Sequence, residues 1–289
     1  LFLSGLTPFF SLLMSVTLTH ETAMESPPIL TLEQVGKTYA NGTVALQDFN
    51  LKVQPGTITS LVGPSGCGKS TVLKLVSGLG EMTSGRMTWA DDYKPSSRRS
   101  QRNPHKLAYV FQEAALMPWA TVMDNVRLPL KLAKVPKRQA LEAVSDAIAQ
   151  VGLQGFERCY PRELSGGMKM RVSIARALVT QPQILLMDEP FGALDEMTRG
   201  KLNQELLALQ DQRQLTILFV THSVYEAVYL AHKVVVMASK PGRVIAEIPI
   251  EAPHPREPDY RTSPQFNRYC RDVSHCLSQA MGDSLAIAL

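Results

Sequence analysis

The sequence has few cysteines and little excess charge. Four cysteines occur among 289 residues, and none forms a CxxC pair. This spacing offers no metal framework and suits a reducing compartment. The net charge is only +4, and the one dense basic cluster consists of Arg98, Arg99, Arg102 and Lys106. A nucleic-acid patch is one interpretation of this cluster, but we favour a solvated loop and expect no nucleic-acid partner.

The sequence also lacks internal repeats and low-complexity segments. One long apolar run occurs at its start, LFLSGLTPFFSLLMSVTLTH. A signal peptide or membrane anchor would explain it, but the run has no basic residues before it, no small-residue cleavage pattern, and contains Gly5 and Pro8. Met24 stands just before the first strand pattern. We therefore expect residues 1–23 to be an upstream extension or a start-site artefact, and we assign residues 1–28 to a disordered or artefactual N-terminal extension.

Strand-like and helix-like patterns alternate from residue 29 onward. ILTLEQVGKTY and FNLKVQPGTITSLVGP alternate apolar and polar residues around turn signals, which predicts antiparallel strands leading into a buried one. Residues 141–151 show helical spacing, and apolar runs at 184–187 and 215–220 flank a helical stretch at 196–210. This alternation predicts an α/β fold with helices packed on a parallel sheet.

Proline becomes frequent beyond Ser239. We therefore expect residues 246–289 to form an extended tail that contains one short helix. An apolar stripe on that helix would dock the tail on the domain, and it consists of Phe266, Tyr269, Cys270, Val273 and Leu277.

The segment GPSGCGKST at residues 63–71 matches the phosphate-binding pattern GxxxxGK[ST], the P-loop. It lies between the strand pattern TITSLV and the helical TVLKLVSGL, as the motif requires; a plain glycine-rich turn is the alternative. Lys69 would reach the β and γ phosphates, and Ser70 would ligate Mg²⁺. Backbone N–H groups and the helix dipole would hold the phosphates. The predicted nucleotide contacts are Gly63, Pro64, Ser65, Gly66, Cys67, Gly68, Lys69, Ser70 and Thr71.

Polar side chains follow three other apolar runs. Asp188 would hold Mg²⁺ directly or through water, and Glu189 would deprotonate an attacking water, although such a pair can also be only a helix N-cap. His222 and Gln112 follow LTILFVT and LAYVF. Strand ends at one edge of a parallel sheet gather at the ligand crevice. We therefore expect His222 to contact the γ-phosphate and Gln112 to reach the metal or the water, while a purely structural role is the alternative for the histidine.

The segment LSGGMKMR places two glycines where a helix should begin. Gly166 and Gly167 each lower helix stability by about 1 kcal/mol relative to alanine in a helix interior. We therefore expect a binding partner to contact the backbone there, where no side chain is in the way. A helix N-terminus with exposed N–H groups is an anion site.

In the order of these elements the sequence resembles the ATP-binding subunits of ABC transporters, from about Leu30 to Val244. The resemblance implies an ABC ATPase fold of the P-loop NTPase class, with a parallel sheet core, an antiparallel β-subdomain and a helical subdomain inserted at about 113–180, in a domain spanning 29–245. It implies that Tyr39 stacks on adenine and that Asp195 of GALD belongs to the nucleotide site. It also implies that the signature residues Ser165, Gly166 and Gly167 contact the γ-phosphate of ATP held by another subunit.

One P-loop and one signature cannot complete such a site alone. The resemblance therefore implies a second ATPase subunit, two copies head to tail around two ATP molecules with Mg²⁺. It further implies transmembrane permease subunits, a periplasmic or extracellular solute-binding protein that acts via the permease, and a peripheral position on the cytoplasmic face of the cell (inner) membrane. LMPW at 116–119 resembles the surface that receives a permease helix, although Met117 and Trp119 could equally be core.

Finer features narrow the resemblance. MDEPFGALDEMTR and VTHSVYEAVYLAHKVVVMASKPGRVIAEI are similar to the ATPases of nitrate, sulfonate and taurine importers. We therefore expect an ATPase that powers uptake of a small solute of this kind. The alternative is a non-transport ABC-type ATPase acting on nucleic acid or ribosomes; such proteins usually carry coiled-coil insertions, a second cassette or basic arms, and this sequence has none. Met170 departs from the usual glutamine of the signature helix.

Overall fold

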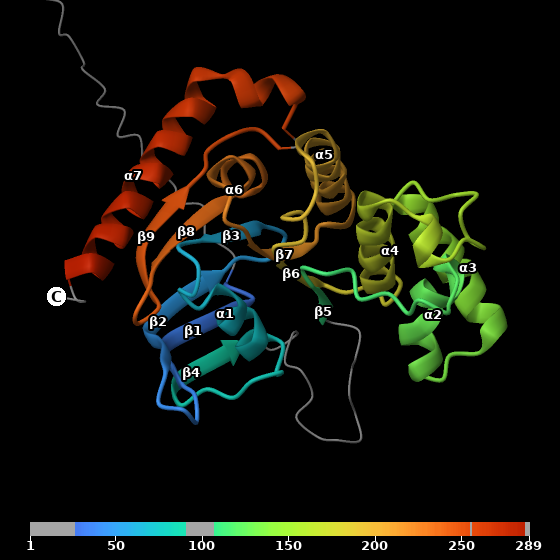
Figure 1. Cartoon of the computed structure of the whole chain (residues 1–289), viewed down its shortest axis with the longest axis horizontal. Helices are drawn as coiled ribbons and strands as arrows, with labels where there is room; N and C mark the ends of the chain where they lie inside the picture. Colours follow the sequence, from blue (N-terminus) through green and yellow to red (C-terminus); the bar gives the residue numbers. More distant parts are fainter. Residues whose placement is uncertain (1–26, 91–106, 255, 287–289) are drawn as a thin grey trace, which may run out of the picture.

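The computed structural model describes residues 27–90, 107–254 and 256–286 (Figure 1). Residues 1–26 and the basic cluster at 98–106 lie outside the described residues, so the predictions of an N-terminal extension and a solvated loop stay predictions.

The core is a six-stranded sheet in which five strands run parallel. Its spatial order is β5 (Leu107–Val110), β6 (Ile184–Asp188), β7 (Thr216–Val220), β3 (Ile58–Val62), β8 (Lys233–Ala238) and β9 (Arg243–Pro249). Only the β8–β9 pair is antiparallel. Every residue of β3 and β7 is buried, because helices cover both faces of a parallel sheet and favour continuous apolar runs. The predicted parallel core is confirmed.

A second, three-stranded sheet is antiparallel. Its order is β2 (Val44–Val53), β1 (Leu30–Thr38) and β4 (Ser84–Trp89). Helix α1 (Lys69–Val76) packs between the two sheets: Val72 and Leu73 share one apolar cluster with Phe49 of β2 and with Leu186 and Leu218 of the large sheet. This confirms the predicted antiparallel subdomain.

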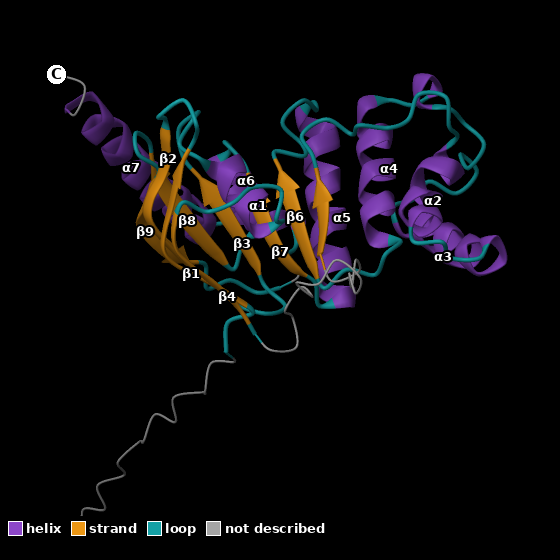
Figure 2. Cartoon of the chain, turned by 90° about the horizontal axis from the view of Figure 1, so that it is seen from below, coloured by secondary structure: helices purple, strands orange, loops and turns teal. Residues whose placement is uncertain are grey.

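Three α-helices and a 3-10 turn (Pro161–Glu163) lie between β5 and β6 in the chain, and the α-helices form the predicted inserted helical subdomain. They are α2 (Val122–Leu132), α3 (Lys137–Gln150) and α4 (Gly166–Leu178). Val144 and Ile148 of α3 are buried, as their spacing predicts. Figure 2 shows these helices standing beside the sheet, next to α5 (Glu196–Arg213), while α7 (Pro264–Ala286) lies at the other end of the molecule.

The C-terminal region differs from its prediction. Residues 243–249 form the edge strand β9, which the proposed boundary at 245 divides, and the helix is long: α7 (Pro264–Ala286) has 23 residues. One proline is the last residue of the strand and another is the first residue of the helix, positions where a missing N–H costs little. The prolines therefore mark the ends of these elements and do not prevent them from forming. A 3-10 turn (Pro258–Thr262) precedes α7.

The predicted docking stripe does pack on the domain. Phe266, Cys270 and Val273 of α7 are buried in the larger apolar cluster, together with residues of α5 and of α6 (Val224–Leu230). No helix within residues 27–90, 107–254 and 256–286 combines the length and the apolar character needed to cross a membrane.

Candidate active site

A cavity of about 680 Å³ opens where β3, β6 and β7 end. The P-loop after β3, Glu189 after β6 and His222 after β7 all face it, as does Gln112 after β5. Tyr39 also lines it, and this residue is 40% exposed. The full lining is Tyr39, Thr43, Val44, Ala45, Ser65, Gly66, Cys67, Gly68, Lys69, Ser70, Thr71, Gln112, Glu189, His222 and Lys240. Most of the predicted nucleotide contacts therefore come together here.

The P-loop backbone requires its glycines. Gly66 and Gly68 adopt φ values of +77° and +96°, which residues other than glycine rarely adopt. A Cβ on Gly63 would lie 2.7 Å from the Met237 carbonyl oxygen, closer than real contacts allow. Helix α1 begins directly after Gly68 without a side-chain cap, so its first N–H groups remain available for an anion.

Lys69 is nearly buried within the loop that it serves. Its Nζ donates to the carbonyl oxygens of Gly63 and Pro64 at 2.8 and 3.1 Å. Burial raises the pKa of the neighbouring Cys67 thiol, although the Lys69 charge opposes this. The thiol is thus uncharged at neutral pH, and the ammonium is the group in this loop that can attract phosphate.

Asp188, at the end of β6, accepts hydrogen bonds from two hydroxyl groups. Ser70 Oγ donates to Asp188 Oδ1 at 2.8 Å, and Tyr109 Oη donates to Oδ2 at 3.0 Å. Burial, together with the Asp188 charge, raises the pKa of Tyr109, so the phenol remains a donor. No motif in the sequence points to Tyr109. Its position in LAYV marks it as a strand residue, but only the pairing of β5 with β6 brings it to the carboxylate.

Glu189 and His222 both line the cavity, with 3.4 Å between Glu189 Oε2 and His222 Nδ1. Glu189 adopts φ +46°, a strained value for this residue, and its N–H donates to the Val220 carbonyl oxygen at 2.9 Å. The turned backbone sends the Glu189 side chain to the cavity and away from the strand. This arrangement can orient a water molecule and accept its proton.

The signature residues lie elsewhere. Among the described residues that line the cavity, none belongs to the segment 165–167, and Asp195 is likewise outside it. Ser165 caps α4 by accepting from Met168 N–H at 3.3 Å, and Asp195 caps α5 by accepting from Thr198 N–H at 2.9 Å. That second bond lowers the pKa of Asp195.

The two glycines of the signature differ in their surroundings. Gly166 is exposed, whereas Gly167 is buried against α5. A Cβ on Gly167 would lie 2.6 Å from Thr198 Cγ2. Close packing of α4 on α5 is therefore one reason for glycine at position 167, a reason that sequence analysis did not provide.

A surface groove of about 420 Å³ lies between β5 and the helical subdomain, and its walls include Tyr109, Phe111 and Leu132. In the LMPW segment, Trp119 is 77% exposed, so the core alternative is wrong for this residue. Met117 is half-buried.

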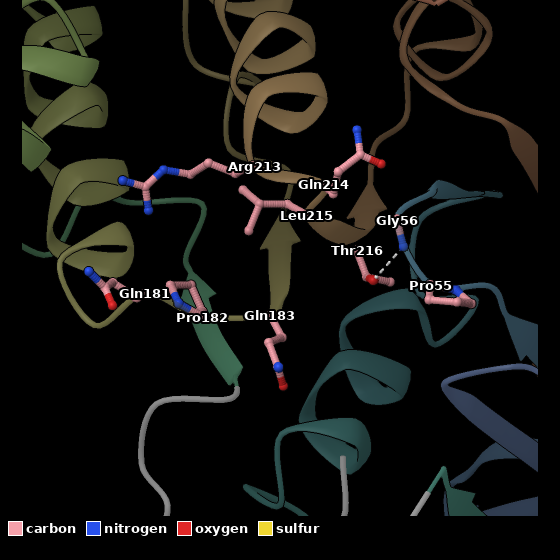
Figure 3. Close-up of a pocket in the computed structure, with 9 residues that line it drawn as sticks. All are labelled: Pro55, Gly56, Gln181, Pro182, Gln183, Arg213, Gln214, Leu215 and Thr216. Carbon is pink, nitrogen blue, oxygen red and sulfur yellow. Dashed lines mark hydrogen bonds between the residues drawn. The ribbon is translucent and has the colours of Figure 1, made fainter. Parts of the chain in front are cut away.

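Figure 3 shows a second cavity of about 660 Å³ at the opposite edge, where β3, β6 and β7 begin. Pro55, Gly56, Gln181 and Arg213 are among its lining residues, and Gly56 N–H donates to Thr216 Oγ1 at 2.9 Å. None of its described lining residues is a predicted site residue. The candidate chemistry therefore belongs to the carboxyl ends of the strands.

A phosphate-binding loop, a Ser-Asp pair and a Glu-His pair at the carboxyl edge of a parallel sheet define a nucleotide-hydrolysing P-loop protein. Known proteins specify the class further. The family described as ABC transporter matches residues 46–192. An uncharacterised ABC transporter ATP-binding protein of Methanocaldococcus jannaschii is 41% identical over 254 residues, which cover 88% of this chain and 92% of that protein. An aliphatic sulfonates import ATP-binding protein of Bacillus licheniformis is 43% identical over 224 residues, covering 78% and 83%.

Solved structures agree. CbiO1 of Clostridium perfringens, part of an ABC transporter complex, superposes with a TM-score of 0.70 at 30% identity and covers 77% of this chain and 88% of that one. A dimeric ATP-binding cassette in a post-hydrolysis state with ADP and phosphate has a TM-score of 0.66 at 31% identity, with coverage of 77% and 99%. The chain belongs to the ABC transporter family, and it is an ATP-binding ATPase subunit of that family.

Proposed function

We propose that this chain is the ATP-hydrolysing subunit of an ABC importer that takes up a small solute such as nitrate, a sulfonate or taurine. The observation that carries the proposal is the convergence of the P-loop, Glu189 and His222 on one cavity. The likeness to an aliphatic sulfonates import protein supports the importer class and this kind of solute.

ATP binding would start at the P-loop. Lys69 exchanges its bonds to the Gly63 and Pro64 carbonyl oxygens for the β and γ phosphates, while the N-terminus of α1 supplies N–H donors. Tyr39 offers its half-exposed ring to adenine, and its hydroxyl lies 3.2 Å from Thr71 Oγ1, which steadies the ring.

The donor set near Asp188 fits Mg²⁺. The Ser70 hydroxyl and the Asp188 carboxylate lie 2.8 Å apart, and Gln112 and Ser70 both line the nucleotide cavity. Hydroxyl, carboxylate and amide oxygens are the hard ligands that Mg²⁺ prefers. When bound, the ion would neutralise phosphate charge; Ser70, Asp188 and Gln112 are the residues that would hold it.

Hydrolysis would use Glu189 as the general base. Its carboxylate accepts a proton from the attacking water, whose oxygen displaces ADP from the γ-phosphorus. His222 Nδ1 lies 3.4 Å from Glu189 Oε2, and His222 lines the same cavity at the end of β7, where it would contact the γ-phosphate. Both groups sit on turns after buried strands, so they are held in place before the substrate arrives.

A second ATPase subunit would complete each site. Ser165 and Gly166 are exposed, and among the described residues they do not line the chain's own cavity, so they are available for ATP held by a partner. The dimeric form of a related cassette supports pairing with a second subunit, which we propose to be head to tail. Asp195, next to the signature through Thr198, would lie at the same interface.

The groove beside β5, with exposed Trp119 nearby, would receive a helix of a transmembrane permease subunit. The protein would then lie on the cytoplasmic face of the cell membrane and act on a solute delivered to the permease by a solute-binding protein.

Uptake by reconstituted complexes tests this function. The chain is co-expressed with transmembrane permease subunits, and ATP-dependent uptake of labelled taurine, an alkanesulfonate and nitrate is measured in proteoliposomes. Uptake of one of them by the wild type, and its loss in Glu189→Gln, is the expected result. ATPase activity stimulated by nucleic acid or ribosomes, without uptake, would favour the non-transport alternative.

A further inference from the structure

Asp188 is held by protein groups on both of its carboxylate oxygens. Ser70, on α1, donates to Oδ1, and Tyr109, on β5, donates to Oδ2. The P-loop motif accounts for the serine. No motif in the sequence accounts for the tyrosine, although its 3.0 Å bond is of ordinary length for a phenol and a carboxylate.

The strand register explains how Tyr109 reaches Asp188. In the parallel pair of β5 and β6, Tyr109 is the Cα partner of Leu186. Side chains two residues apart lie on the same face of a strand, so Asp188 shares the face of Leu186 and lies one step further toward the carboxyl end. The long tyrosine side chain spans that step. A shorter hydroxyl residue at position 109 would not.

The Tyr109 ring is itself held in place. It stacks on Phe111, with 4.3 Å between the ring centroids and 29° between the planes, and both rings line the groove beside β5. The stack restricts rotation of the phenol, so the hydroxyl remains aimed at Asp188.

We propose that Tyr109 is a positioning residue that holds the Asp188 carboxylate in the orientation needed for Mg²⁺. This inference rests on the proposed Mg²⁺ role of Asp188. With hydroxyl groups on both oxygens, the carboxylate plane is fixed by neutral donors. A cation in their place would compete with the metal. Tyr109 would act only through Asp188, since it is not among the described residues that line the nucleotide cavity. Partners of this kind around a metal ligand commonly change metal affinity ~10- to 100-fold when removed.

The test is an equilibrium titration with a fluorescent ATP analogue, carried out without Mg²⁺ and over a range of Mg²⁺ concentrations. Tyr109→Phe removes the hydroxyl and keeps the ring stack. We expect its half-saturating Mg²⁺ concentration to rise about tenfold, with unchanged affinity for the analogue in the absence of Mg²⁺. Tyr225→Phe, which removes the hydroxyl of an exposed tyrosine on α6, is the matched control and should titrate like the wild type.

A second variant tests the ring stack. Phe111→Leu frees the phenol but leaves its hydroxyl, so the Mg²⁺ requirement should rise by a smaller factor. If Phe111 acts only through Tyr109, the double variant should match Tyr109→Phe alone.

The outcomes separate the two hypotheses. If the wild type binds the analogue with Mg²⁺ dependence and Tyr109→Phe shows the same half-saturating concentration, the positioning role is wrong while the proposed function stands. If Tyr109→Phe weakens binding equally with and without Mg²⁺, the tyrosine supports the fold and not the metal ligand, which also overturns the inference. If the wild type itself binds no ATP analogue, the proposed function fails and takes this inference with it.

Discussion

Two separate reasons for glycine at position 167 can be tested, namely its packing against Thr198 and its contact with a partner's nucleotide. A Cβ at this position would meet Thr198 Cγ2 at 2.6 Å, about 1 Å inside an ordinary carbon–carbon contact. Overpacking of this kind costs about 1–3 kcal/mol, and alanine recovers up to about 1 kcal/mol of helix propensity. We therefore expect Gly167→Ala to lower the free energy of unfolding by about 1 kcal/mol, with a Tm lower by about 2–4 °C.

The neighbouring residue allows a rescue. Thr198→Ser removes Cγ2 but keeps the backbone N–H that donates to Asp195, so the double variant Gly167→Ala with Thr198→Ser should recover the wild-type Tm. Thr198→Ser alone is the control. Thermal unfolding without nucleotide measures all four proteins.

The second reason is the partner's nucleotide. In a Glu189→Gln background, which slows hydrolysis, we expect Gly167→Ala to weaken ATP-dependent dimerisation, and we expect the Thr198→Ser rescue to restore Tm without restoring the dimer. Size-exclusion chromatography with and without ATP reads this. A rescued variant that dimerises fully would show that Gly167 serves packing alone, and an unchanged Tm in Gly167→Ala would refute the contact argument.

Four further outcomes are expected. Glu189→Gln should keep ATP affinity and lower turnover at least ~10²-fold, as for loss of a general base. It should also elute as an ATP-dependent dimer in size-exclusion chromatography. Adding Ser165→Arg should abolish this dimer, and survival of the dimer would mean that the signature does not face the partner's ATP. Lys69→Ala should abolish tight ATP binding, since it removes the cation of the loop, and an unchanged dissociation constant in a nucleotide titration would contradict the P-loop assignment. Deleting residues 1–23 should leave ATPase activity and transport intact; loss of membrane assembly with an intact fold would support the anchor alternative. Burial lowers the pKa of His232 to about 4 and of the stacked His254 to about 3, so the unfolded chain binds more protons between pH ~4 and ~6.5 and stability should fall as pH drops through that window; His254→Phe should flatten a melting profile against pH, and an unaltered profile would exclude this residue as the cause.

The sequence by itself determined the features that depend on contiguous residues. The P-loop could be predicted because its glycines, Lys69 and Ser70 lie within nine residues and are flanked by a strand and a helix. Glu189 and His222 could be predicted to share a cavity because parallel strands end at one edge of a sheet, and the structure brings them to 3.4 Å. The apolar stripe of α7 likewise predicted that the helix packs on the domain.

Only the tertiary structure decided which elements became neighbours. Tyr109 meets Asp188 because β5 pairs with β6. The two residues are 79 positions apart in the chain, and no local pattern encodes their contact. Gly167 is confined by Thr198 because α4 crosses α5 at that point. Residues 243–249 form an edge strand because their backbone pairs with that of β8. The frequency of proline in this region could not predict that pairing. Each of these contacts joins segments that are far apart in the chain. A local sequence pattern cannot predict such contacts, because they form only when the whole chain folds.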